Sequence, residues 1–370
     1  MGKKKIDIIV PCYNEEQNIE AFYSETQAVV ASIRESGGYE HSYDFAYIFI
    51  DDGSTDGTLK KIKHVANQAA AEQTTVKYIS FSRNFGKEAA MYAGLKASAE
   101  GATVGTAGNP EAADTTATPP TADTPEAGGP ADYAVIMDAD LQHPPALIEE
   151  MLRAVEKTGC DSAAARRVSR KGEPRIRSAF ARLFYKLMNR YCEIEIVDGA
   201  VDFRMMSRRM VRAIVNMPES QRFSKGIFAW VGFDTEWIEF ENTRRLSGET
   251  KWTVWKLTKY AIDGFIDFAD SPLKFAGAFG GVIAAGSAVY LIVEVIKTIL
   301  MGKDTPGYAS TVCLILFFGG AIIAILGLIG EYIGRMYLET KRRPIFIEKE
   351  SNLSDTEEGS AAEEESSIER

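Results

Sequence analysis

The chain has 370 residues, of which 52 are acidic and 42 basic, giving a formal net charge of −10. Two segments carry the acidic excess: residues 101–131 hold four acidic and no basic residues, and residues 351–370 hold seven acidic and one basic. The rest holds 41 of each, so a basic nucleic-acid-binding surface is not expected. The four cysteines form no C-x-x-C pair, which excludes the usual zinc and disulfide patterns. The N-terminus becomes polar too early for a signal peptide.

Residues 5–100 alternate between strand and helix patterns. Apolar runs predict strands at 6–10, 45–50 and 76–81. The segments between and after them predict three helices: one at 15–36, one that follows DDGSTDGT and ends at about residue 71, and one at 86–99. This alternation predicts an α/β fold with a mostly parallel sheet that is covered on both faces. Ligands of such sheets bind at the carboxyl ends of the strands.

Residues 101–131 are rich in Ala, Thr, Pro, Gly and acidic residues, which predicts a disordered insertion. It directly precedes the next strand, and we expect an inert loop rather than a cover over a site. The following residues predict a helix at 145–157, an edge strand at 160–166 and an amphipathic helix at 176–190.

Two aspartates, Asp138 and Asp140, follow the apolar run YAVIM at the end of a predicted buried strand. Two carboxylates at this place would repel each other and would be costly to desolvate, so a positive group is expected beside them. Because Mg²⁺ takes oxygen ligands and shares them with substrate phosphates, the motif predicts a metal–diphosphate site. The alternative from the motif alone is a solvated loop after a strand.

Other strand ends also carry polar groups suited to a nucleotide. Asp51 and Asp52 follow the second strand, Gly53 allows a tight turn, and Asp56 is placed to cap the next helix. The turn after the first strand has no G-x-G-x-x-G, which disfavours a dinucleotide-binding Rossmann domain. After the third strand, SRNFGKE supplies Arg83 and Lys87, which could neutralise phosphates or simply be solvated charges at a helix start.

Two uncharged stretches, 275–293 and 309–330, contain 19 and 22 residues. At ~1.5 Å per residue, each is long enough to cross a hydrocarbon core of roughly 30 Å. The loop between them holds only Lys303 and Asp304, whereas the outer flanks hold Lys251, Lys256, Lys259, Lys274, Arg335, Lys341, Arg342 and Arg343. This asymmetry predicts that both termini are cytoplasmic. A buried helical hairpin is the alternative.

The residues before the first stretch, 251–272, predict an amphipathic helix. Its polar residues recur at spacings of three and four and form one narrow stripe, at Lys256, Lys259, Asp263, Asp267 and Asp270. Aromatic residues and lysines on such a helix suit the headgroup level of a membrane. A soluble core helix is the competing interpretation.

Four motifs in chain order, PCYNEE, DDGSTDGT, SRNFGKEAA and DADLQHPP, resemble those of family 2 glycosyltransferases, which have the GT-A nucleotide-diphospho-sugar transferase fold. RKGEPRIRSAFARLFYKLMNR, DFRMMSR, FAWVGF and GETKW, followed by two spans, resemble the polyprenyl-phosphate glycosyltransferases, such as bactoprenol glucosyltransferase and, more distantly, dolichyl-phosphate mannose synthase. The resemblance covers about residues 5–345, except the insertion. It implies a catalytic domain at 1–250, the interfacial helix at 251–272, a transmembrane hairpin at 273–338 and a cytoplasmic tail at 339–370, disordered from about 351.

The resemblance also implies roles for individual residues. The donor nucleotide would be bound by Pro11, Tyr13, Glu15, Asp52, Lys87, Asp138 and Ala139. Asp140 and Gln142 would ligate Mg²⁺ (or Mn²⁺) on the diphosphate, and Asp202 would lie near the sugar and the acceptor, so Asp140 and Asp202 are the expected catalytic residues. The acceptor phosphate or the diphosphate would be held by Arg204, Arg222, Arg245 and Lys251. His143, flanked by prolines, is expected at the surface.

The function implied is inverting transfer of a hexose from a nucleotide sugar to undecaprenyl phosphate, at the cytoplasmic face of the bacterial inner membrane. The lipid phosphate is already ionised at neutral pH, so a strong general base is less necessary than in transfer to an alcohol. UDP-glucose is the preferred donor. GDP-mannose and donors of galactose, N-acetylhexosamine or aminoarabinose stay open, as does a homo-oligomeric state.

Three other functions are weighed. A processive polysaccharide synthase normally shows Q-x-x-R-W, which Gln221-Arg222-Phe223 does not match. An aspartate-nucleophile phosphatase needs its D-x-D after the first strand, where this chain has Pro11-Cys12-Tyr13-Asn14. A non-catalytic membrane scaffold predicts the loss of acidic positions that this chain retains.

Overall fold

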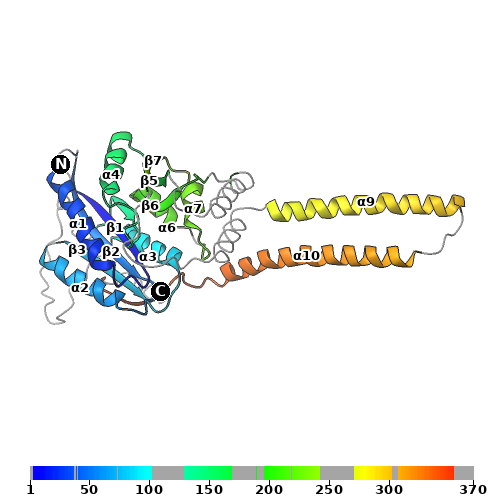
Figure 1. The fold of residues 1–370 in the computed structure, drawn as a ribbon, viewed down its shortest axis with the longest axis horizontal. Coiled ribbons are helices and arrows are strands. Elements are labelled where there is room, and N and C mark those ends of the chain that lie inside the picture. The colour runs from blue at the N-terminus through cyan, green and yellow to red at the C-terminus, as the bar shows by residue number, and fades with distance from the viewer. Residues whose placement is uncertain are drawn as a thin grey trace, which may run out of the picture. The chain divides into compact units, whose positions relative to one another are not determined.

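The computed structural model describes residues 3–36, 39, 41–72, 74–101, 129–168, 189, 196–217, 219–241, 271–301 and 307–353. The chain divides into two compact units, each described by itself (Figure 1). The first comprises Met1–Tyr185, Ile196–Trp252 and Pro344–Arg370, and the second comprises Lys186–Glu195 and Thr253–Arg343.

Several predicted segments fall outside the described residues. They are the insertion at 101–131 apart from its two ends, the amphipathic helix at 176–190 apart from Asn189, almost all of the interfacial helix at 251–272, and the tail beyond residue 353.

The first unit is built on an eight-stranded mixed sheet, with the strand order β7-β5-β6-β4-β1-β2-β3-β8. The strands are β1 (Lys3–Cys12), β2 (Ser42–Asp51), β3 (Thr75–Phe81), β4 (Tyr133–Ile136), β5 (Ser162–Arg167), β6 (Ala200–Ser207), β7 (Thr235–Phe240) and β8 (Glu348–Ser351). Strands β1 to β4 pair with one another in parallel, whereas β6 and β8 run antiparallel to their neighbours. The predicted α/β fold with a mostly parallel sheet is confirmed.

Helices cover both faces of this sheet. Helices α1 (Ile19–Glu35), α2 (Thr58–Ala71) and α4 (Leu147–Thr158) share one apolar core with alternate residues of the central strands, among them Ile8 and Val135. Helix α3 (Lys87–Glu100) packs against β1 and against α6 (Arg208–Val215), and α7 (Ser224–Trp230) contacts β6. Because both faces are covered, the central strands are apolar almost throughout.

Helix α3 lies close to the sheet because its inward residues are small. A Cβ atom at Gly94 would lie 2.2 Å from Cγ2 of Ile9 in β1, a distance that no relaxed structure tolerates. Ala90, Ala93 and Ala97 on the same helix are also buried. This close approach holds α3, whose first residue is Lys87, near β1.

The prediction that residues 160–166 form an edge strand was wrong. Strand β5 lies between β6, which is antiparallel to it, and β7, which is parallel to it. The two covering strands come from later in the chain, and the pattern of β5 itself carries no information about such long-range partners.

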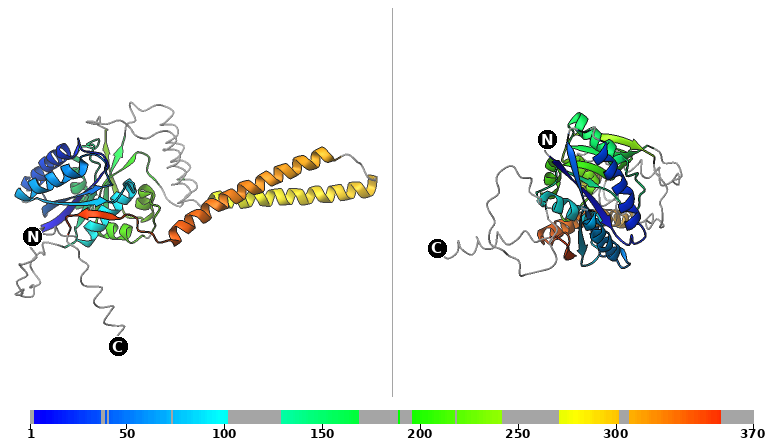
Figure 2. Two further views of the ribbon diagram at one scale, coloured as in Figure 1. Left: turned by 90° about the horizontal axis from the view of Figure 1, so that it is seen from below. Right: turned by 90° about the vertical axis from the view of Figure 1, so that its left-hand side faces the viewer.

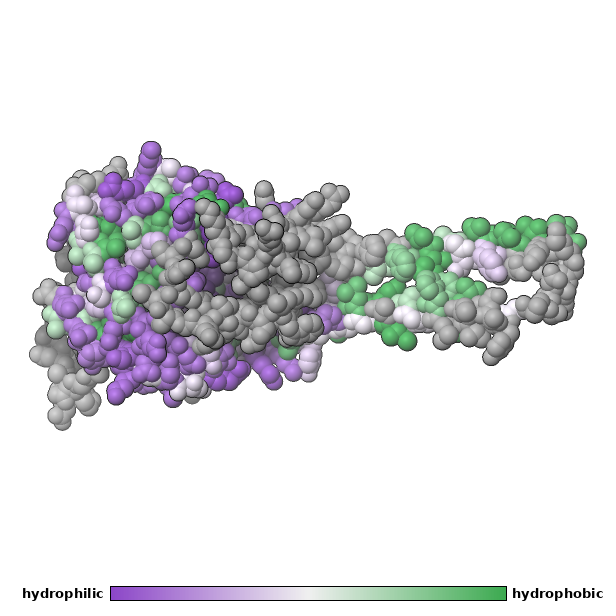
Figure 3. All heavy atoms as spheres, viewed as in Figure 1, coloured by the Kyte–Doolittle hydropathy of each residue, from purple (hydrophilic) through white to green (hydrophobic). Residues whose placement is uncertain are grey.

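The second unit contains α9 (Ser271–Met301) and α10 (Tyr308–Thr340), of 31 and 33 residues, which lie alongside each other (Figures 1 and 2). Many of their large apolar side chains are exposed, among them Val282, Ile299, Ile315, Ile323 and Leu326. Figure 3 shows this apolar character on one face of the described hairpin residues. Within the described chain, one helical stretch, Phe317–Thr340, is long and apolar enough to cross a membrane.

The described ends of the insertion are held together at the amino end of β4. The backbone N–H of Ala131 donates to the carbonyl of Ser98, 3.3 Å away. Arg208 donates to the carbonyls of Pro130 and Ala131 and pairs with Asp132 at 3.0 Å. The aspartates of the D-x-D motif follow the carboxyl end of β4. The insertion is therefore anchored at the end of this strand that lies away from the D-x-D motif.

Replacing residues 102–128 with a short Gly-Ser linker is therefore expected to leave the folded unit intact. The described hydrogen bonds that anchor the insertion, those of Ala131 and Arg208, involve residues outside the deletion, so the free energy of unfolding should change by no more than about 0.5 kcal/mol. Thermal unfolding of the full-length and shortened chains in detergent measures this change. Arg208→Ala, which removes the anchor, is the contrasting variant and should lower the unfolding midpoint. A large loss on deletion would contradict the anchoring account.

Candidate active site

The ends of four neighbouring strands meet at one edge of the sheet. In the parallel register Cys12 pairs with Asp51, and Asp51 pairs with Ser80, so β1, β2 and β3 end side by side. Strand β4 joins them, with Ile136 beside Ile9 of β1. The polar segments that follow these strands therefore gather at a single place, as the parallel arrangement predicts.

Strand β6 brings a further aspartate to this edge. It pairs antiparallel with β4, with Ile136 opposite Arg204. Extending that register by two residues puts Asp138 opposite Asp202. The two aspartates, which are 64 residues apart in sequence, are therefore brought close together, Asp202 on β6 and Asp138 two residues after β4.

A lysine ammonium joins these two carboxylates. Nζ of Lys87, the first residue of α3, lies 2.7 Å from Oδ1 of Asp138 and 2.8 Å from Oδ2 of Asp202. Burial acts to lower the pKa of Lys87, but the two carboxylates outweigh it and raise that pKa well above its usual value. The positive group expected beside the D-x-D motif is thus Lys87.

The charge of Asp202 is stabilised by its neighbours. Burial acts to raise the pKa of Asp202, but the positive charges of Lys87, Lys225 and Arg204 hold that pKa well below its usual range. Asp202 is therefore ionised at neutral pH. Lys225, near the start of α7, is a cation that the sequence analysis did not single out.

Asp52 holds the loop that carries Lys87. Its carboxylate accepts hydrogen bonds from the backbone N–H groups of Phe85, at 2.6 Å, and Gly86, at 2.9 Å. Burial raises the pKa of Asp52 to about 6, although both hydrogen bonds act to lower it. These contacts give Asp52 a role in the protein's own loop, and its contact with a base or a ribose stays a prediction.

The turns after β1 and β2 are bonded to each other. Asn14, at φ 55°, accepts from the backbone N–H of Thr55 at 2.9 Å, and the backbone N–H of Glu15 donates to Thr58. Asp56 accepts from the backbone N–H of Thr58, the first residue of α2, at 3.0 Å, but the N-cap position itself is held by Gly57, so Asp56 contacts the helix start from one residue before the predicted cap position.

Gly53 lies where the β2 and β3 turns come closest. It has φ +63°, and a Cβ atom there would lie 2.3 Å from the carbonyl carbon of Arg83. Of the other predicted donor contacts, Tyr13 is 39% exposed, Pro11 is the penultimate residue of β1, and Ala139 is buried. Their contacts with a nucleotide stay predictions.

Asp140, Leu141 and Gln142 make a tight turn after β4. The backbone N–H of Gln142 donates to Oδ1 of Asp140 at 3.1 Å, and Leu141 has φ 54°. A left-handed conformation is strained for leucine, and such strain is often found at functional sites. The turn places the carboxylate of Asp140 and the side-chain amide of Gln142, both possible oxygen ligands of a metal, two residues apart in sequence.

These oxygen donors suit a hard divalent cation. Magnesium keeps several waters and uses one or two protein carboxylates together with substrate phosphates, so a closed cage is not required. The described residues contain no group of three or more His, Cys, Asp or Glu side chains that could hold a metal by themselves.

The prediction that His143 lies at the surface was wrong. It is 7% exposed and contacts the rings of Phe203, at 5.6 Å, and Phe240, at 5.4 Å. Burial lowers its pKa, although Asp138 and Asp140 act to raise it, so the ring is neutral at pH 7. The flanking prolines suggested a surface turn, but both aromatic partners come from strands that the sequence analysis did not predict.

Of the predicted acceptor-binding residues, two are described. Arg204 is buried, with its guanidinium 3.9 Å from the ring centre of Phe228, and its Nε has no hydrogen-bond partner among the described residues. Arg222 instead donates to the carbonyls of Met217 and Ile214, both at 3.1 Å, at the end of α6. In this structure Arg222 therefore binds backbone carbonyls, whereas the prediction was that it binds the acceptor phosphate or the diphosphate. Arg245 and Lys251 lie outside the described residues.

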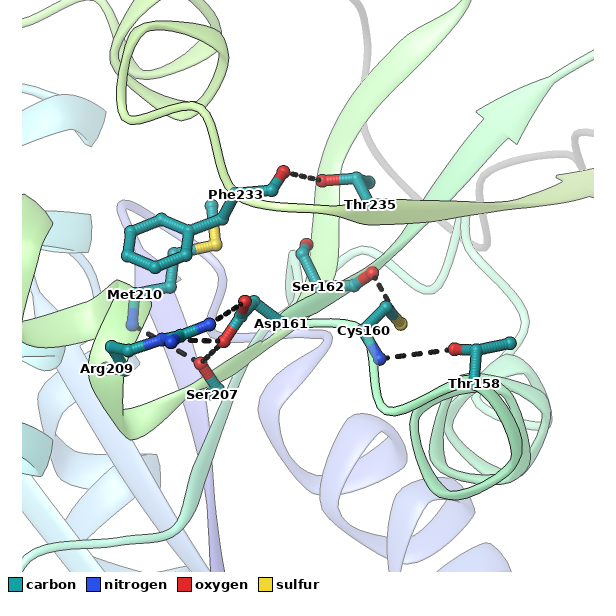
Figure 4. A network of polar contacts seen from close by, with 9 residues as sticks. All are labelled: Thr158, Cys160, Asp161, Ser162, Ser207, Arg209, Met210, Phe233 and Thr235. Carbon is teal, nitrogen blue, oxygen red and sulfur yellow. Dashed lines mark hydrogen bonds and ion pairs between the residues drawn. The ribbon is translucent and has the colours of Figure 1, made fainter.

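A separate polar network lies at the other end of the strands, where β5 begins and β6 ends (Figure 4). Asp161, just before β5, accepts from Ser207 at the end of β6, at 2.8 Å, and pairs with Arg209 of α6. Ser207 in turn caps α6 by accepting from the backbone N–H of Met210. This network holds the start of β5 against the end of β6 and the first turn of α6.

The fold is GT-A-like: a mostly parallel α/β sheet with acidic turns gathered at its carboxyl edge. Residues 7–104 and 126–215 match the model of the family "Glycosyl transferase family 2", and residues 271–336 match "GtrB C-terminal hairpin". The chain belongs to glycosyltransferase family 2, which confirms the resemblance of its motifs.

Relatives extend the match to nearly the whole chain. The "Putative glycosyltransferase CsbB" of Bacillus subtilis is 37% identical over 353 residues, covering 95% of this chain and 94% of the relative. The "Prophage bactoprenol glucosyl transferase homolog" of Escherichia coli is 35% identical over 347 residues, covering 93% and 98%. Among solved structures, a mannosyltransferase from Pyrobaculum calidifontis in complex with GDP-Man and Mn2+ covers 88% of each chain at 14% identity and a TM-score of 0.43, too low to transfer a ligand.

Lys87→Met should destabilise the protein in a pH-dependent way. At pH 7 we expect a loss on the order of 1 kcal/mol of unfolding free energy, a modest value because the Lys87 side chain is 40% exposed and solvent screens the pair. The contribution of a depressed aspartate pKa is present above about pH 4 and is lost as pH falls, so the difference from the wild type should shrink in acid.

Unfolding monitored by circular dichroism between pH 3 and pH 8 measures this difference. Lys96→Met is the matched control, since Lys96 lies on the same helix and its ion pair among the described residues is an exposed contact of 3.8 Å with Glu100. A Lys87→Met loss that is independent of pH would contradict the ion-pair account.

Proposed function

We propose that this protein transfers a hexose, with inversion, from a nucleotide-diphosphate sugar to undecaprenyl phosphate, and that UDP-glucose is the donor. The observation that carries the proposal is the meeting of Lys87, Asp138 and Asp202 at the strand ends, in a chain with bactoprenol glucosyl transferase relatives over nearly its full length. The carboxylates suit sugar hydroxyls and a metal, and the ammonium suits a diphosphate.

Charge balance supports a metal-dependent site. Asp138, Asp140 and Asp202 bring three negative charges to one neighbourhood, and a donor diphosphate would add more. Lys87, Lys225 and Arg204 balance the three carboxylates but leave the charge of the diphosphate unbalanced, so a divalent cation held by Asp140 and Gln142 is part of the proposal. Mg²⁺ or Mn²⁺ there would stabilise the leaving nucleoside diphosphate.

The remaining steps belong to the protein's own side chains. Lys87 would release the carboxylates in part and bind a phosphate of the donor. Asp202, ionised beside Asp138, would orient the sugar, and Arg204 would hold the acceptor phosphate behind the anomeric carbon. The lipid phosphate oxygen then forms its bond to that carbon as the bond to the nucleoside diphosphate breaks, so positioning carries most of the catalysis.

The proposal includes a location. The apolar, exposed surfaces of α9 and α10 support a hairpin that spans the bacterial inner membrane twice, with the catalytic unit and both termini in the cytoplasm. A polyprenyl acceptor cannot leave the bilayer, so a membrane-anchored catalytic unit suits it. The interfacial helix proposed at 251–272 and Lys251 would lie on the acceptor side, and association into homo-oligomers is compatible with this arrangement.

A panel of donors tests the proposal. Membranes containing the protein are supplied with undecaprenyl phosphate, Mg²⁺ and one labelled UDP- or GDP-sugar at a time, and lipid-linked label is measured. We expect label from UDP-glucose only. Label from GDP-mannose or another sugar would change the donor, and no label from any donor would favour a non-catalytic scaffold.

Asp140→Ala tests the metal assignment. Loss of a metal ligand should lower transfer about 100-fold or more, because the leaving diphosphate loses several kcal/mol of stabilisation. Asp44→Ala is the control, since the ion pairs of Asp44 with described residues are exposed, at 3.4 Å, and lie near the amino end of β2. Undiminished transfer by Asp140→Ala would refute the metal assignment and leave the transferase proposal standing.

A further inference from the structure

The chain that follows the helical hairpin returns to the catalytic sheet. Strand β8 pairs antiparallel with β3 and covers what would otherwise be an edge of the sheet (Figure 2, red arrow). Asn352 reinforces this pairing: its side chain accepts from the backbone N–H of Tyr78 at 2.7 Å and donates to the carbonyl of Val76 at 2.9 Å. We call Phe346–Asn352 the C-terminal strap. It lies outside every role assigned so far.

The strap places an aromatic ring against the end of β3. Phe346 stacks on Phe81, the last residue of β3, with ring centres 4.8 Å apart and planes 19° apart. It also contacts Tyr92 of α3, at 6.5 Å. In addition, the backbone N–H of Ser82 donates to the carbonyl of Ile347 at 3.0 Å. The strap therefore contacts both elements that the loop joins, β3 at Phe81 and α3 at Tyr92, and also Ser82 in the loop itself.

That loop carries Lys87 into the active site. Phe81 packs edge-on against Phe85 at 5.8 Å, and Phe85 and Gly86 donate their backbone N–H groups to Asp52. Lys87 follows immediately and pairs with the two facing carboxylates. The loop is thus held on one side by Asp52 and on the other by stacked rings that begin with Phe346.

We propose that Phe346 is a positioning residue for Lys87, so that the segment following the hairpin completes the donor side of the active site. The inference rests on the proposed function for its kinetic consequences, but its structural claim does not. Removing the ring of Phe346 takes away the ring that stacks on Phe81 and leaves the Phe81–Phe85 contact unsupported on that side. The loop then gains freedom while the fold of the sheet is retained. Displacements of about 1 Å are enough to reduce catalysis strongly.

The first measurement is independent of any activity. Hydrogen exchange of the full-length protein should be faster at the amides of Phe85 and Gly86 in Phe346→Ala than in the wild type, because their bonds to Asp52 open more often. The matched control is Glu350→Gln, which removes the ion pair with Lys63 (2.7 Å) from the same strand without touching Phe346. Unchanged exchange at these amides in Phe346→Ala would overturn the proposal, whatever the protein's activity.

The second measurement separates positioning from general loosening. With UDP-glucose and undecaprenyl phosphate, Phe346→Ala should lower kcat and raise the donor KM, giving about a 10-fold loss in kcat/KM for the donor, with the lipid KM unchanged. Phe346→Tyr, which keeps the stacking ring, should restore both values. Equal changes in donor and lipid KM, or an equal loss in Glu350→Gln, would show a structural role only and overturn the proposal.

A double-mutant cycle then asks whether Phe346 acts through Lys87. In the Lys87→Met background, Phe346→Ala should cause little further loss of UDP-glucose affinity, since the side chain that it positions is already absent. Independent, additive losses would overturn the assignment. If the wild type transfers no sugar from any donor, the proposed function fails, and the exchange experiment still decides the positioning claim.

Discussion

One ammonium group between two facing carboxylates sets the geometry of the catalytic edge. Asp138 follows β4 by two residues and Asp202 lies on β6, its antiparallel neighbour, and without a cation their repulsion and burial would destabilise this part of the sheet. Lys87 supplies that cation at 2.7 and 2.8 Å from the start of α3, whose small residues let it approach β1 closely. The sheet register, the packing of α3 and the loop bonded to Asp52 all serve to hold this one contact.

The sequence was most informative where the relevant pattern is local. The strands that carry the acidic turns could be predicted from apolar runs, and the D-x-D motif indicated that a positive group must lie nearby. The identity of that group as Lys87, and the position of Asp202 opposite Asp138, depend on a β4–β6 register that no local pattern encodes. The same limit explains β5, predicted as an edge, and the burial of His143 against Phe203 and Phe240.

The last strand shows how distant parts of the chain contribute to one site. Strand β8 follows α10 in sequence, yet it pairs with β3 and stacks Phe346 on Phe81. A short run of charged residues before an acidic tail gave no strand signal, because edge strands are often polar. The catalytic unit therefore contains chain from before and from after the hairpin. The loop that carries Lys87 contacts Asp52, early in the sequence, and packs through Phe81 against Phe346, late in the sequence.

The most direct test of the account is a structure of the full-length protein with UDP-glucose and Mn²⁺ bound. We predict that the diphosphate lies beside Lys87 and that metal density touches Asp140, with Lys87 no longer bridging both carboxylates. A nucleotide bound elsewhere, with the Lys87 bridge to Asp138 and Asp202 unchanged, would contradict the assignment of this edge as the donor site.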